Sequence, residues 1–82
     1  MALSTKKINQ ALDVLDEFTE RDRDKTIILS CLETDAECDF MLKIVKEKKL
    51  KHPSDVLYVA LKICEERDNA NGKKNYLKNV KL

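Results

Sequence analysis

Catalysis in this chain would have to begin with its single histidine or its cysteines, and their positions argue against it. His52 is the only histidine and lies in a lysine-rich turn. A cysteine nucleophile needs a histidine within hydrogen-bond reach and a third group that orients the pair. Cys31, Cys38 and Cys64 instead fall in the apolar phases of predicted helices, where a cysteine behaves as a small core residue. We therefore expect no enzyme activity.

Metal and phosphate sites are not expected either. The histidine and the three cysteines have the right chemistry for zinc, but they lack the short Cys-x₂₋₄-Cys spacing that presents paired thiolates. An acidic pattern similar to an EF-hand loop begins at Asp22, but the position that requires a glycine turn is Ile27. The only glycine is Gly72, so the chain has no glycine-rich phosphate loop. The sequence predicts no metal and no cofactor.

Lysines in the second half of the chain form the basis of an alternative, nucleic-acid binding. A small helical domain could present them as one basic surface, as a variant of the helix-turn-helix class does. Recognition helices usually present Arg, Asn or Gln to base edges, and no predicted helix has such a face. A small helical nucleic-acid-binding or transcription-regulating protein thus remains the second hypothesis. The lysines concerned are Lys46, Lys48, Lys49, Lys51, Lys73, Lys74, Lys78 and Lys81.

The elements that must position these side chains are helices. In 82 residues with 43% apolar content there is material for one modest core, and one glycine and one proline are too few for a many-stranded fold. We expect an all-α, single-domain bundle of four to five short helices. Residues 1–72 should form the helical domain, and residues 73–82 a basic C-terminal segment that is either a short helix or a flexible tail.

Two helices are predicted in the first 33 residues. Ser4 or Thr5 can cap the first, whose apolar stripe follows spacings of three and four. In the second, apolar residues point in almost every direction around the axis, which predicts a short and deeply buried helix. A strand is also compatible with that pattern, but no second β-rich run exists to pair with it. The stripes are Ile8, Ala11, Leu12, Leu15 and Phe18, then Ile27, Ile28, Leu29, Cys31 and Leu32.

Two further helices are predicted after residue 33. Thr34 and Glu37 form a T-x-x-E capping box that begins the third helix. Its apolar arc is wide, since Phe40 and Ile44 extend the main stripe, so this helix either contacts two neighbours or exposes these two residues to a partner. Pro53 begins the fourth helix, because proline is favoured at the first helical position.

The hydropathy pattern predicts a cytoplasmic protein. No stretch approaches the roughly 18–20 apolar residues needed to cross a bilayer, and the first ten residues lack the apolar core of a signal peptide. The three cysteines are then expected to stay reduced.

The two halves of the chain differ in charge. Residues 1–41 carry five Lys/Arg and ten Asp/Glu, whereas residues 42–82 carry eleven Lys/Arg and five Asp/Glu. Such halves can attract each other internally or face partners of opposite charge.

The whole chain resembles a known family. Its start, MALSTKKINQALDVLDEF, its 82-residue length and its lack of a membrane segment are similar to those of the cytoplasmic antiholin of T-even bacteriophages, the product of the third rapid-lysis locus. The resemblance implies inhibition of host-cell lysis. The phage holin forms holes in the inner membrane of the infected bacterium, and this small protein would bind the holin's cytoplasmic N-terminal region. Such inhibition needs binding energy and no chemistry.

The resemblance does not assign binding residues, but the residue pattern suggests two surfaces. The first is Phe40 with Ile44, which lie off the main stripe of the third helix. The second is the C-terminal segment, where apolar anchors would sit inside a charged rim, as in many interfaces. Ordinary core packing is the alternative for both. The second set is Tyr76, Leu77 and Val80 with Lys73, Lys74 and Lys78. Self-association of the acidic and basic halves also remains open.

Overall fold

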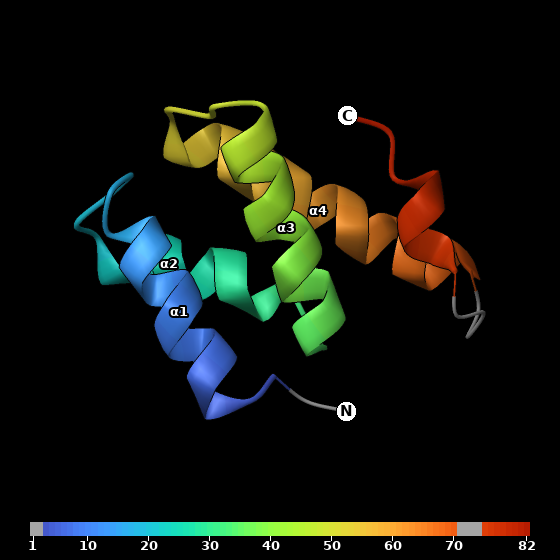
Figure 1. Cartoon of the computed structure of the whole chain (residues 1–82), viewed down its shortest axis with the longest axis horizontal. Helices are drawn as coiled ribbons and strands as arrows, with labels where there is room; N and C mark the ends of the chain where they lie inside the picture. Colours follow the sequence, from blue (N-terminus) through green and yellow to red (C-terminus); the bar gives the residue numbers. More distant parts are fainter. Residues whose placement is uncertain (1–2, 71–74) are drawn as a thin grey trace.

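A computed structural model describes residues 3–70 and 75–82, and in these ranges every regular element is helical (Figure 1). The predicted all-α class is confirmed, as is a number of helices within four to five. The radius of gyration is 11.9 Å, close to the roughly 12 Å expected for one compact domain of this length. The elements are α1 (Thr5–Leu15), α2 (Asp22–Ser30), α3 (Asp35–Glu47), α4 (Pro53–Ala70) and a 3-10 turn, η1 (Tyr76–Asn79).

Helix α1 begins at a serine cap and is joined there to α3. The Ser4 hydroxyl accepts a hydrogen bond from the Lys7 N–H at 3.2 Å, so Ser4 rather than Thr5 is the cap. The Ser4 N–H in turn donates to a carboxylate oxygen of Asp35 at 2.8 Å. Lys7 also pairs with Asp39. These contacts hold the N-terminal ends of α1 and α3 together, and the two helices rise side by side in Figure 1.

Helix α2 is less buried than its sequence predicts. It is a helix rather than a strand, but within it only Ile28 is buried, and Ile27 keeps 40% of its surface exposed. The reason is its position at the edge of the bundle. Its main contacts are with α1 and α4, and Ile27 lies on a side that stays open to solvent. Leu32, just past the end of the helix, returns to the core.

Helix α3 is defined by strong signals at both ends. The predicted capping box is present, with the Thr34 hydroxyl accepting from the Glu37 N–H at 3.2 Å and the Glu37 carboxylate accepting from the Thr34 N–H at 3.3 Å. At the other end, Lys49 adopts a positive φ of 51°. The Lys49 N–H bonds to the Lys46 carbonyl, and the Leu50 N–H to the Val45 carbonyl. This is a Schellman motif, which ends the helix sharply.

Helix α4 is the longest element, and in Figure 1 it passes behind α3 towards η1. It packs against α2, α3 and η1. It begins at Pro53, as predicted, with the carbonyl of His52 accepting from the N–H groups of Asp55 and Val56. Helix α3 contacts both α1 and α4, so its wide apolar arc serves two neighbours. The core between the helices consists of Ala11, Leu15, Ile28, Leu32, Cys38, Met41, Val45, Val56, Val59, Ala60 and Ile63.

The end of the chain lies against this bundle. Residues 76–79 form the single 3-10 turn η1, which packs on α4. Tyr76, Leu77 and Val80 are half-buried against the core. The boundary predicted at residues 72 and 73 falls outside the described residues. Across residues 3–70 and 75–82, no helix combines the length and the apolar character needed to cross a membrane.

Candidate functional site

A buried carboxylate occupies the point where α3, α4 and η1 meet. The side chain of Glu37 is completely enclosed. Its Oε1 accepts hydrogen bonds from the N–H of Glu33 at 2.6 Å and from Nη1 of Arg67 at 2.9 Å. Its Oε2 accepts a hydrogen bond from the hydroxyl of Tyr76. Both carboxylate oxygens are therefore satisfied, which a buried charge requires if it is to persist.

Arg67 extends this network to neighbouring elements. Its Nη1 also donates to the carbonyl of Cys31 at 3.1 Å, just after α2, and its Nη2 lies 3.3 Å from the sulfur of Cys64. Its Nε pairs with a carboxylate oxygen of Glu33 at 3.4 Å. One guanidinium thus links the end of α2, the start of α3 and the body of α4. A planar group with five donors is suited to this role.

The network shifts the proton affinity of its members in the directions expected for a stable ion pair. Burial alone would raise the pKa of Glu37, but the Tyr76 hydroxyl, the Glu33 N–H and Arg67 outweigh it and hold the pKa below its ordinary value. Burial and the hydrogen bond to Glu37 raise the pKa of Tyr76 from 10.0 to about 12. At neutral pH the carboxylate is charged and the phenol is neutral, so their hydrogen bond is charge-assisted. The cluster fixes η1 to the bundle.

The sequence did not predict this network. It identified Glu37 only as part of a capping box, which is a contact over three residues. Its partners Arg67 and Tyr76 lie 30 and 39 residues away in the chain. A lone arginine and a tyrosine near the C-terminus carry no spacing signal that would connect them to it. The one available signal was that Glu37 is a charged residue on the otherwise apolar side of α3, where it would need buried partners.

The partner surfaces predicted from the sequence are only partly open. Phe40 and Ile44 are half-buried and pack against the core cluster. In the C-terminal segment Lys78 is exposed, while the three apolar residues lie against the bundle as described above. Lys73 and Lys74 lie outside the described residues. More freely exposed apolar side chains are found elsewhere, at Tyr58 and Leu61 on α4 and at Ile27 on α2.

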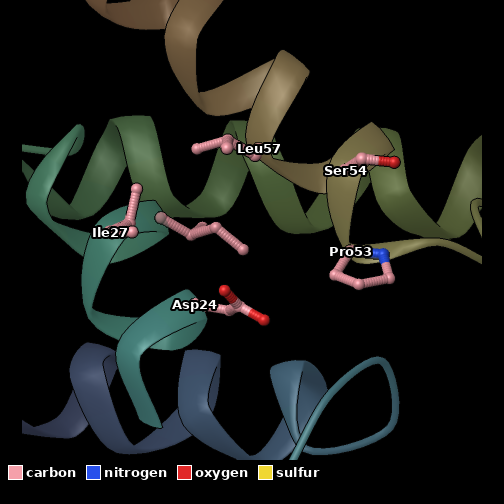
Figure 2. A pocket seen from close by; sticks show the side chains of 6 residues that line it. Asp24, Ile27, Pro53, Ser54 and Leu57 are labelled. Atoms are coloured by element: carbon pink, nitrogen blue, oxygen red, sulfur yellow. The ribbon is translucent and has the colours of Figure 1, made fainter. Parts of the chain in front are cut away.

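A first surface groove lies between α2 and the start of α4 (Figure 2). Its volume is about 230 Å³. Ile27 and Leu57 point toward each other from the two helices, and the carboxylate of Asp24 faces Pro53 at one end. Asp24 also accepts a hydrogen bond from the Thr19 hydroxyl at 3.2 Å. Ile28 and Ser54 complete the lining. The groove is apolar with one carboxylate.

A second groove, larger at about 420 Å³, lies between the C-terminal ends of α1 and α3. We refer to it below as the α1–α3 groove. Its walls are apolar, and its rim carries two lysines from α3 and the following turn and one glutamate from the α1 side. It is open to solvent. Its lining consists of Gln10, Val14, Glu17, Phe18, Leu42, Val45, Lys46, Lys49 and Leu50.

The cysteines are distributed through the structure as small apolar residues. Cys38 is buried, Cys31 and Cys64 are half-buried, and all three are free thiols. Burial raises the pKa of the Cys31 and Cys38 thiols, so both stay protonated at neutral pH. Within the described ranges, no three side chains of His, Cys, Asp or Glu lie close enough together to share a metal ion.

Comparisons with known proteins add no relatives. No protein-family model matches the chain, and neither curated proteins nor solved structures include a significant match.

Proposed function

We propose that the protein is a non-enzymatic antiholin that acts in the cytoplasm of a phage-infected bacterium. It delays host-cell lysis by binding the cytoplasmic N-terminal region of the holin. The sequence resemblance over the whole chain suggests this role. The structural observation that supports it is a pair of open apolar grooves between helices of a small bundle, which is a geometry suited to binding a segment of another protein.

The mechanism requires only selective binding. A holin passes from a non-assembling to a hole-forming state, and a ligand shifts that equilibrium by its difference in affinity for the two. A tenfold preference for the non-assembling form corresponds to about 1.4 kcal/mol. A domain that buries a few apolar anchors of the holin segment readily provides that difference.

Calorimetric titration against the soluble N-terminal segment of the phage holin tests the proposal. We expect saturable binding that persists from low to moderate salt, because an interface with an apolar centre weakens little as charges are screened. A scrambled segment of the same composition is the control. Absence of binding at both salt concentrations would reject the antiholin function.

A second candidate, nucleic-acid binding, is favoured by one observation. Lys46, Lys48, Lys49 and Lys51 are all exposed around the turn between α3 and α4, and none forms an ion pair with a residue in the described part of the chain. If four lysines contact duplex phosphates, the logarithm of the binding constant should fall with the logarithm of salt concentration at a slope of about −3.6. A gel-shift titration with duplex DNA over a salt series measures it. A slope near zero rejects this candidate.

A further inference from the structure

The α1–α3 groove combines apolar walls with an unbalanced positive rim. Val14 and Phe18 from the α1 side line it together with Leu42 and Leu50 from the α3 side, and all four are only half-buried. Lys46 and Lys49 stand on the rim, exposed, and neither forms an ion pair with any described residue. Glu17 is the only acidic side chain in the lining. The groove therefore carries a net positive charge beside uncovered apolar surface.

The conformation of Lys49 is a second, independent observation at the same place. It occupies the C′ position of the Schellman motif with φ 51°, where glycine is strongly preferred because it has no Cβ to clash with the backbone. The turn would thus be more stable with glycine. Lysine at this position costs the turn some stability, so its side chain beside the groove is a candidate for a role in binding.

We propose that the α1–α3 groove binds an amphipathic α-helix of the partner protein whose apolar stripe is flanked by carboxylates. The apolar stripe would contact Phe18, Leu42 and Leu50, and the carboxylates would pair with Lys46 and Lys49. A helix seated between two helices is a common mode of peptide recognition. The inference rests on the proposed function, since it takes the ligand to be a protein segment, and it adds the place and the charge of that segment.

The other surfaces fit this ligand less well. The groove between α2 and α4 has a smaller volume, and its lining carries the carboxylate of Asp24 and no basic side chain, so it would not attract an acidic helix. A nucleic acid would match the lysines but not the apolar walls, which would stay uncovered. A second copy of the chain fits less well, because among the described residues its helices are packed in its own bundle and the centre of the α1 stripe, Ala11 and Leu15, is buried in the core.

Two synthetic helical peptides test the proposal without the holin. They share one apolar stripe and differ only in carrying Glu or Lys at the flanking positions. Each is titrated into the ¹⁵N-labelled full chain while amide shifts are recorded by NMR. We expect the Glu peptide to shift the amides of the groove lining, and the Lys peptide to bind at least tenfold more weakly.

Paired charge reversals provide the matched control. The variant K46E/K49E changes both rim lysines and should weaken the Glu peptide at least tenfold. The variant K48E/K51E makes the same change in charge in the same turn, outside the groove lining, and should weaken it less than threefold. Circular dichroism at the titration temperature verifies that each variant is folded.

The outcomes separate this inference from the function on which it rests. If neither peptide shifts the groove amides, if the Lys peptide binds equally well, or if both double variants weaken binding equally, the groove proposal is wrong. Equal weakening together with tight DNA binding would instead favour a nucleic-acid surface. Binding of the holin segment to K46E/K49E with unchanged affinity would leave the antiholin function in place and reject this groove as its site.

Discussion

At the scale of single residues, Glu37 has two roles that are usually separate. As a member of the capping box it closes the first turn of α3, and as a buried carboxylate it holds Arg67 and Tyr76. Burying a charge without partners costs several kcal/mol in a protein interior, on the order of the whole stability of a small domain. The two tasks are compatible because the carboxylate has two oxygens with several acceptor positions, and the structure uses both.

The hydrogen bond from Tyr76 to this carboxylate should contribute measurably to stability. The variant Y76F keeps the ring and leaves one charged oxygen with fewer donors, so the free energy of unfolding should fall by about 2 kcal/mol. Urea denaturation followed by circular dichroism measures the change. The variant Y58F removes the hydroxyl of a tyrosine that is 49% exposed, and it should change stability by less than about 0.5 kcal/mol. Equal effects of the two variants would contradict the role assigned to Tyr76.

The same pair makes stability depend on pH at both extremes. The pKa of Tyr76 is raised on folding to about 12, so its contribution is complete below its ordinary value of 10.0 and is lost as pH rises from 10 toward 12. The pKa of Glu37 is lowered on folding, so its contribution is complete above its ordinary value of 4.5 and is lost as pH falls through the folded value. The urea midpoint measured from pH 3 to pH 11.5 should fall at both ends. In Y76F the alkaline fall should be shallower, because the phenol that loses its proton there is absent.

At the scale of elements, the helix boundaries are where sequence reasoning was most successful. Ser4, Thr34 and Pro53 each begin a helix. They do so through contacts or backbone angles that involve only a few neighbouring residues, so the starts of these helices can be predicted from the local sequence. The predicted deep burial of α2 is wrong. The prediction followed from apolar residues that point to all sides of the helix. Which side of a helix is covered depends on the packing of helices distant in sequence. Ile27 therefore stays 40% exposed, although isoleucine is an apolar residue that was expected in the core.

The end of α3 provides a test in which stability and binding are expected to move in opposite directions. Replacing Lys49 by glycine relieves the left-handed strain and should raise the free energy of unfolding by about 1 kcal/mol. If the groove binds an acidic helix, K49G should nevertheless weaken that binding. The control is K48G, since the C-cap Lys48 has a negative φ of −90°, so glycine relieves no strain there and should destabilise by about 0.5–1 kcal/mol. Urea denaturation of both variants measures the stabilities. A loss of stability in K49G would show that the turn is not strained.

At the scale of the whole molecule, the C-terminal segment is a structural part of the bundle. Removing residues 75–82 takes away three half-buried apolar side chains and the hydroxyl that bonds Glu37, which together should cost about 3 kcal/mol. For a domain of this size such a loss lowers the melting temperature by about 12 °C or more. Differential scanning calorimetry of the truncated chain measures it. A melting temperature within about 3 °C of the full chain would show that the segment contributes little.

The class of fold and the absence of long apolar spans could be predicted from composition and periodicity, because these depend on the chain's average properties. The buried network and the two grooves could not. Glu37, Arg67 and Tyr76 meet only because α4 crosses the bundle and η1 returns to it. The α1–α3 groove likewise arises from the relative placement of two helix ends. The sequence indicated the lysines of its rim but not the apolar walls beside them.

Sharing one carboxylate between distant parts of the chain has a consequence for synthesis on the ribosome. While only the first half of the chain has emerged, Glu37 has its local cap but neither Arg67 nor Tyr76, and enclosing it would leave a charge without its partners. Packing of the early helices into a closed core around Glu37 is therefore energetically unfavourable at this stage. Growth of the chain proceeds at about 5–20 residues per second, so Tyr76 follows Glu37 out of the ribosome by a few seconds. The nascent protein should become fully folded in one late step, when the tyrosine arrives.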